Sequence, residues 1–218
     1  MGQTGAFLEF LMPLLAAALT TIGISAGAFV VALVLGFVLA SVRYLWPVRL
    51  VTIPLQAFVE IYRNIPSLTH LFILYFGLAY LGVRLSSVTA AILGLGLIGA
   101  AGLSEVYRAG FQAVPVGQRE AAFAIGLTPW QVFREIVAPQ AWRIALPPIG
   151  NYAVQLIKDT SLVAAIAAPE IMFTARNLVV NTFETTLVYL LATLIYLALC
   201  LPLVVLLRSV EKRASTPR

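Results

Sequence analysis

Four charged side chains interrupt apolar stretches of this chain and are its first candidates for chemistry. Glu60 and Arg63 stand three residues apart in one stretch, and Lys158 and Asp159 are neighbours in another. A charge at the centre of a membrane helix costs about 2.5–3.5 kcal/mol on insertion scales, so such residues usually face the interior of a helix bundle. Glu60 and Arg63 can pair on one helix face. Lys158 needs a partner on another segment or a local break in its helix.

Residues for covalent or metal chemistry are scarce. The chain has one histidine, His70, and one cysteine, Cys200, with no acidic cluster near either at metal-ligand spacing. It contains no G-x-x-x-x-G-K-[S/T] phosphate loop, and the G-x-G-x-x-G at residues 94–99 lies in a charge-free apolar stretch. We expect those glycines, together with Gly102, to let neighbouring helices approach closely. The sequence predicts neither an enzyme nor a cofactor or metal bound by this chain.

The elements that position these residues are long apolar helices. Of the 218 residues, 61% are hydrophobic and only 11% are charged, which places the chain in a bilayer. Because a span needs roughly 20 apolar residues, we predict an all-α membrane protein with one domain and five transmembrane helices. The predicted spans cover approximately residues 14–42, 52–80, 86–112, 144–168 and 185–208.

The distribution of Lys and Arg predicts the orientation of these spans. Five spans put the termini on opposite faces, and the basic residues then gather on one of them. Only Arg84 and Arg176 fall on the other face. By the positive-inside rule the N-terminus is outside and the C-terminus is cytoplasmic. The formal net charge of +5 therefore reflects topology and contact with anionic lipids, and no nucleic acid partner is expected. The residues on the predicted cytoplasmic face are Arg43, Arg49, Arg108, Arg119, Arg134, Arg143, Arg208, Lys212, Arg213 and Arg218.

A polar loop at approximately residues 113–143 separates the third and fourth predicted spans. Residues 118–124 favour a short helix, and Gly126 follows it where a left-handed cap is usual. Thr128, Pro129 and Gln131 then predict a capping box that starts a second short helix, which we expect Pro139 to end. One face of this helix is apolar, so the loop can rest on the membrane helices with one face and present the other to a partner. The alternative is an amphipathic loop that lies on lipid headgroups.

The loop also carries a family resemblance. Glu120-Ala121-Ala122, Gly126, Ile136 and Pro139 resemble the EAA motif of permease subunits of bacterial ATP-binding-cassette (ABC) importers. The similarity, to the polar-amino-acid subfamily, extends over roughly residues 15 to 210. In relatives a small residue and Thr more often stand between the Arg and the Pro of residues 63–66. The further matching segments are Glu60 to Pro66, Val114 to Gln118, Leu146 to Asn151 and Leu156 to Leu162.

The resemblance implies a mechanism and a set of partners. Two permease subunits form a pathway in the bacterial inner membrane, a cytoplasmic ATPase subunit binds ATP and Mg²⁺, and an external solute-binding protein delivers the solute. The second permease is either a copy of this chain or a paralogue. Polar amino acids or similar zwitterions are the implied solutes. The residues implied to couple to the ATPase are Gly117, Gln118, Glu120, Ala121, Ala122, Gly126 and Pro139.

Polar residues within the spans have two interpretations. They line or gate the solute pathway, where a zwitterion needs hydrogen-bond donors and acceptors, or they form an interhelical network that only holds the helices in register. An ion-coupled amino-acid carrier is the alternative function, although we find no second EAA-like block or duplicated half. The pathway candidates are Glu60, Arg63, Asn151, Lys158, Asp159, Thr160 and Ser161.

Overall fold

The computed structural model describes residues 3–214, and helices account for all of its regular structure. Arg218, which entered the orientation argument, lies outside the described residues. Two segments, η1 and η2, are π-helical, and η3 is a 3₁₀ helix. The elements are α1 (Gln3–Leu45), α2 (Arg49–Asn64), α3 (Ser67–Phe72), η1 (Ile73–Gly77), α4 (Leu78–Tyr80), α5 (Ser87–Ala113), α6 (Val116–Ala124), α7 (Pro129–Gln131), η2 (Val132–Val137), α8 (Ala138–Asp159), η3 (Thr160–Ile166), α9 (Ile171–Thr182) and α10 (Thr185–Ala214).

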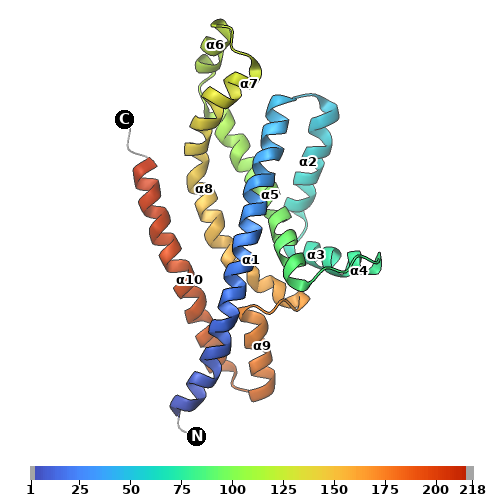
Figure 1. The fold of residues 1–218 in the computed structure, drawn as a ribbon, viewed down its shortest axis with the longest axis vertical. Coiled ribbons are helices and arrows are strands. Elements are labelled where there is room, and N and C mark those ends of the chain that lie inside the picture. The colour runs from blue at the N-terminus through green and yellow to red at the C-terminus, as the bar shows by residue number, and fades with distance from the viewer. Residues whose placement is uncertain (1–2, 215–218) are drawn as a thin grey trace.

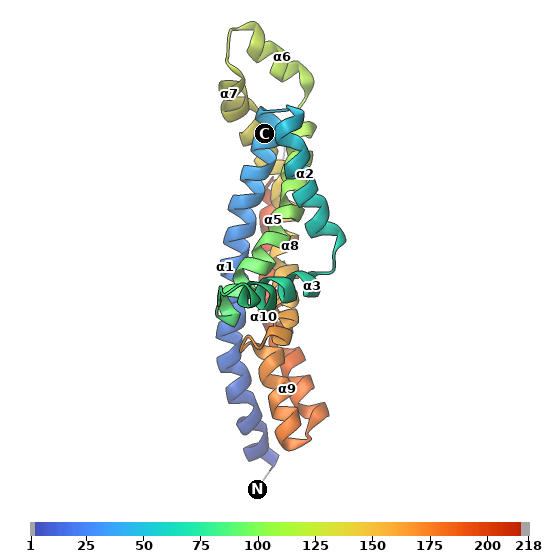
Figure 2. The same cartoon turned by 90° about the vertical axis from the view of Figure 1, so that its right-hand side faces the viewer.

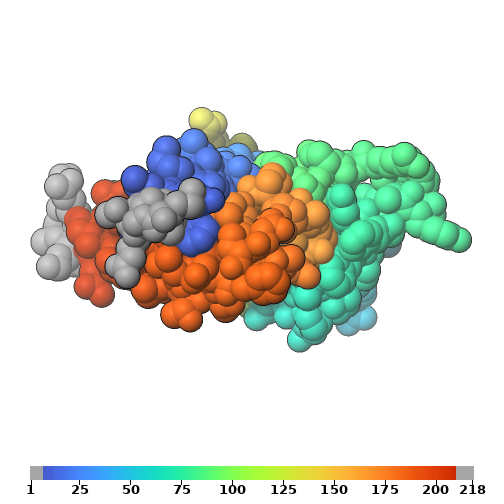
Figure 3. Space-filling model, turned by 90° about the horizontal axis from the view of Figure 1, so that it is seen from below, coloured from blue at the N-terminus to red at the C-terminus, as the bar shows by residue number. Residues whose placement is uncertain are grey.

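The molecule is elongated along α1, which at 43 residues is about 65 Å long. Helices α6 and α7 form one end of the molecule, whereas the start of α1 and α9 form the other (Figures 1 and 2). Helix α10 runs back toward the α6 end and diverges from α8 as it rises (Figure 1). Seen from the α9 end, α3 and α4 project to one side of the bundle (Figure 3). The polar loop is thus far from both α9 and the start of α1.

Small residues let α1 and α5 pack closely along their length. A Cβ atom on Gly36 of α1 would lie 3.0 Å from the carbonyl oxygen of Ala100 on α5. On α5, a Cβ on Gly96 would lie 2.7 Å from the Val31 side chain. The predicted packing role also holds at Gly94 and Gly99. A Cβ added at Gly94 would meet a side chain of α3, and one added at Gly99 would meet side chains of α1 and α8. It does not hold at Gly102, which has nothing within 4 Å of such a Cβ because it borders a cavity.

Three described helices are long and apolar enough to cross a membrane, namely α1, α5 and α10. A fourth crossing exists if Pro129–Ile166 and α9, which are bent by 50° relative to each other, count as one span. The predicted span at 52–80 is not one continuous helix. It breaks at Ile65, which is extended (φ −99°, ψ 139°) because the following Pro66 disfavours helical geometry. The next apolar helical stretch, Ser67–Tyr80, has only 14 residues and lies across the bundle (Figures 1 and 2).

We expect Gly99→Ala to destabilise the bundle. Its new methyl group would overlap the Tyr152 hydroxyl and lie 2.7 Å from the Ala32 Cβ, and overpacking costs about 1–3 kcal/mol. Gly102→Ala is the matched control because it adds the same methyl group to the same helix without a neighbour within 4 Å. The thermal unfolding midpoint of the detergent-purified protein should fall for Gly99→Ala only. Equal midpoints for the two variants would contradict this packing.

Candidate functional site: the polar loop and two cavities

The first half of the polar loop is a short helix that ends in a tight reversal. Helix α6 covers Val116–Ala124, close to the predicted 118–124. Gly126 then adopts φ +86°, a left-handed conformation that favours glycine, as predicted. The amide of Gly126 donates to the Phe123 carbonyl (2.9 Å), and the amide of Leu127 donates to the Ala122 carbonyl (3.2 Å). These bonds satisfy the last carbonyls of α6 and fix the angle at which the chain turns back.

The second half begins with the predicted capping box. The Gln131 side chain accepts from the Thr128 amide (2.8 Å), and the Thr128 hydroxyl accepts from the Gln131 amide (3.4 Å). The prediction that Pro139 ends this helix is wrong, because the helix continues through η2 and α8 to Asp159. Pro139 stands in the first turn of α8, directly after the π-helical turn η2. The wider π turn accommodates a residue that lacks an amide hydrogen.

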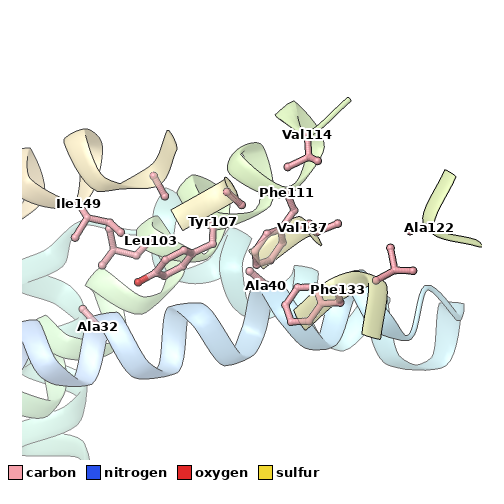
Figure 4. Close-up of a cluster of buried hydrophobic side chains, with 13 residues drawn as sticks. Ala32, Ala40, Leu103, Tyr107, Phe111, Val114, Ala122, Phe133, Val137 and Ile149 are labelled. Carbon is pink, nitrogen blue, oxygen red and sulfur yellow. The ribbon is translucent and has the colours of Figure 1, made fainter. Parts of the chain in front are cut away.

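Buried side chains anchor the loop to the membrane helices (Figure 4). Val132, Phe133 and Val137 are at most 3% exposed, as the predicted apolar face requires. The Phe133 ring lies 5.3 Å from that of Phe111 on α5 and 5.4 Å from that of Tyr44 on α1, measured between ring centroids. The Gln140 side chain donates to the Gln118 side chain and so ties α8 to α6. The loop is therefore a packed extension of the bundle.

The opposite face of the loop is open. Ala122 is only 4% exposed and belongs to the core, while its neighbour Ala121 points outward. Large apolar side chains of the loop are also exposed, including Phe123 at 50% and Ile125 at 79%. Such a patch on a structured loop is typical of a protein interaction site. The other predicted coupling residues, all exposed, are Gly117, Gln118, Glu120, Gly126 and Pro139.

An ion cluster below the loop was missed by the sequence analysis. Glu105 on α5 accepts from Arg43 of α1 (2.7 Å) and pairs with Arg108 one turn later (2.6 Å). Arg43 and Glu105 are 62 residues apart, so their contact could not be predicted from local spacing. Only the Glu105–Arg108 pair has the i,i+3 spacing that indicates a contact on one helix. The cluster links the last turn of α1 to α5 where the aromatic contacts of the loop begin.

Two pathway candidates lie at the break after α2. Glu60 does not form the pair with Arg63 that their spacing allows, and its carboxylate instead accepts from the Asn64 side chain (2.8 Å). Arg63 borders a cavity of about 490 Å³ between the break and helices α5 and α8. Tyr62 and Tyr152, which the sequence analysis did not select, border the same cavity. The Arg63 guanidinium and the Tyr62 phenol can donate hydrogen bonds to a polar solute here, whereas the Asn64 amide and the Tyr152 hydroxyl already donate to Glu60 and to the Leu95 carbonyl.

The remaining pathway candidates lie in the second half of α8 and at the start of η3. They do not all border the same cavity. The expected local break exists, because α8 ends at Asp159 and seven residues of 3₁₀ helix follow. Asp159 accepts from Gln155 (2.9 Å), and Thr160 is buried with its hydroxyl donating to the Ile157 carbonyl (2.6 Å). Asn151 is exposed on α8. Lys158 and Ser161 border a second cavity of about 270 Å³ with Met172 and Tyr196.

The sequence of this chain is similar to a known protein family over most of its length. Residues 32–216 match the model of a family described as "Binding-protein-dependent transport system inner membrane component". A probable amino-acid ABC transporter permease protein of Bacillus subtilis, YckA, is 41% identical over 160 residues, which are 73% of this chain and 71% of the relative. The arginine ABC transporter permease protein ArtQ of Haemophilus influenzae is 34% identical over 214 residues, which are 95% and 96% of the two chains.

Solved structures share the fold. A chain in the crystal structure of an amino acid ABC transporter with histidines superposes with a TM-score of 0.89 at 24% identity, covering 98% of this chain and 99% of that chain. A chain of the MetNI methionine ABC transporter in an inward-facing conformation gives a TM-score of 0.81 at 18% identity, covering 99% and 100%. The arrangement of α1 to α10 is therefore that of known transporter subunits.

Truncating the loop anchor should loosen the loop. We expect Phe133→Ala to cost about 3–5 kcal/mol, since it removes a ring that is 3% exposed and packed against Phe111 and Tyr44. Limited trypsin digestion of the purified protein should then cleave at Arg119 faster than in the parent. Phe123→Ala is the control, because its ring is half exposed. Equal cleavage rates for both variants would show that Phe133 does not anchor the loop.

Proposed function

This chain belongs to the binding-protein-dependent transport system inner membrane component family, and we propose that it is one of two permease subunits of an ATP-driven amino-acid importer. It is a multi-pass membrane protein, as its apolar helices and its family indicate. In this proposal each permease supplies half of the pathway across the bacterial inner membrane. An external solute-binding protein delivers the solute, and a cytoplasmic ATPase subunit binds ATP and Mg²⁺. The partner permease is a second copy or a paralogue.

The exposed face of the polar loop is the observation that carries the proposal. The loop is anchored through buried Ala122 and Phe133, so a force on its outer face reaches α1 and α5 directly. Glu120, Ala121 and Phe123 then contact the ATPase subunit, with the carboxylate for polar contacts and the ring for an apolar groove. Gly117, Gln118, Gly126 and Pro139 border this contact. Ala122 acts from beneath it as part of the anchor.

The proposed orientation follows from the charges and the shape. The last turn of α1, with Arg43, lies at the same end as the loop, and the start of α1 lies at the other end. These features support an orientation in which the loop and the C-terminus are cytoplasmic and the N-terminus is external. In this arrangement α2 makes the fifth crossing, and the crosswise segment Ser67–Tyr80 follows it. The ion-coupled carrier remains the second candidate for function. Uptake that needs ATP and the ATPase subunit and survives collapse of ion gradients excludes it, whereas uptake by this chain alone excludes our proposal.

Gly126→Asp should uncouple ATP hydrolysis from uptake. Aspartate strains the left-handed turn by about 1–2 kcal/mol and so changes the angle of α6 against the ATPase. In proteoliposomes with the complete transporter, we expect hydrolysis to continue while solute imported per ATP falls about tenfold, the change in rate that a barrier higher by about 1.4 kcal/mol produces. Solute preference should stay the same, and an altered preference would contradict a purely mechanical role.

Gly82→Asp is the matched control for that experiment. Gly82 has φ +89°, and a Cβ added there, as at Gly126, would have no neighbouring atom within 4 Å. It lies between α4 and α5, outside the polar loop. The same substitution therefore introduces the same backbone strain without touching the proposed ATPase contact. A loss of coupling in Gly82→Asp equal to that in Gly126→Asp would attribute the effect to general destabilisation.

Asp159→Asn and Glu60→Gln separate the two interpretations of the intramembrane charges. Each substitution removes a charge and keeps the shape, so Gln155 and Asn64 retain an oxygen to which they can donate. If these carboxylates line the pathway, uptake should fall several-fold while co-purification with the ATPase subunit is normal. Loss of the assembled complex would instead assign both residues to holding the helices in register.

A further inference from the structure

Glu170 is a fully buried carboxylate that the sequence analysis did not select. It lies between η3 and α9 and has 0% of its surface exposed. One carboxylate oxygen accepts from the Phe173 amide (2.7 Å), and the other accepts from the Tyr196 hydroxyl of α10 (2.7 Å). A carboxylate among apolar helices is costly unless it is fully hydrogen-bonded, and such residues usually mark a functional position.

The carboxylate fixes a junction of three helices. Through Phe173 it caps the first turn of α9, and through Tyr196 it ties that turn to α10. The first amide of α9, that of Ile171, donates to the Thr21 hydroxyl of α1 (3.4 Å). Here Pro129–Ile166 gives way to α9 with a 50° bend, after a 3₁₀ run longer than usual. Contacts from α1 and from α10 therefore fix the start of α9 at this bend.

Tyr196 connects this junction to the candidate pathway. Its ring borders the cavity of about 270 Å³ that Lys158, Ser161 and Met172 also border. Glu170 does not border that cavity, so it can affect the cavity only through Tyr196. The surface that these residues present to the cavity is almost entirely apolar, so a movement of the large Tyr196 ring would change the shape of its wall.

We propose that Glu170 is a positioning residue for solute passage: its hydrogen bond holds the Tyr196 ring in the wall of the cavity that contains Lys158 and Ser161. The proposal rests on the function proposed above, because the cavity must belong to the solute pathway. A charge-assisted hydrogen bond to a side chain with two rotatable bonds restricts where the ring can sit. Without that bond the ring moves, and the cavity beside Lys158 and Ser161 changes shape.

A cysteine reporter tests the link without knowledge of the solute. Ser161→Cys in a Cys200→Ser background places one thiol at the cavity, and its rate of modification by a small cationic methanethiosulfonate reports access. We expect Tyr196→Phe or Glu170→Gln to accelerate modification about tenfold, as the loss of one charge-assisted hydrogen bond implies. Tyr189→Phe is the control on the same helix, since no hydrogen bond of its hydroxyl occurs among the described residues.

A double-mutant cycle distinguishes positioning from a merely structural role. If Glu170 acts through Tyr196, Glu170→Gln combined with Tyr196→Phe should change the modification rate no more than either substitution alone. Additive effects, or an unchanged rate in Tyr196→Phe, would overturn the proposal. If Glu170→Gln fails to fold, the conservative Tyr196→Phe decides alone.

Uptake measured with Ser161 intact gives the second arm. In proteoliposomes holding the complete transporter and its binding protein, Tyr196→Phe should reduce ATP-driven uptake several-fold with normal complex yield and unfolding midpoint. Faster thiol modification with unchanged uptake would overturn the proposal, because the cavity would then not serve transport. A parent protein that imports nothing under ATP would refute the proposed function, whereas the reporter would still measure the Glu170–Tyr196 link.

Discussion

The close approach of α1 and α5 is the constraint on which the rest of the structure depends. In a bilayer, lipid tails are as apolar as the helices, so helices associate through van der Waals packing and polar contacts. Gly36, Gly96 and Gly99 supply the small surfaces that permit this packing. The Arg43–Glu105 pair adds a charged contact at the loop end of the same interface. These contacts fix the aromatic rings against which the polar loop packs.

The polar loop combines a fixed base with an accessible outer face. Adjacent residues have opposite roles: Ala122 is buried in the core, whereas Ala121 and Phe123, which flank it in the sequence, are exposed. Because interiors are close-packed, a displacement of the loop is transmitted to α1 and α5 and is not absorbed within the loop. This arrangement is compatible with the proposed contact between the loop and a cytoplasmic ATPase subunit.

Local features were predictable from the sequence, and contacts between distant segments were not. Gly126 and the Thr128–Gln131 capping box follow from short-range hydrogen bonding, and both were predicted correctly. Pro139 misled because a π-helical turn, which has no simple sequence signature, lets the helix continue. The Arg43–Glu105 and Glu170–Tyr196 contacts join residues 62 and 26 positions apart, so only the fold brings them together. Of the candidate pathway residues, charge alone indicated Arg63 and Lys158, while the cavities identified Tyr152 and Tyr196.

Photo-crosslinking of the assembled transporter tests the central claim most directly. Phe123 in the loop and Phe183 at the far end after α9 are both exposed, and each can be replaced by a photoreactive benzoyl-phenylalanine. Our account predicts that irradiation crosslinks the probe at 123 to the ATPase subunit and does not crosslink the probe at 183 to it. Capture of the ATPase from position 183, or its absence from the products at position 123, would contradict the account.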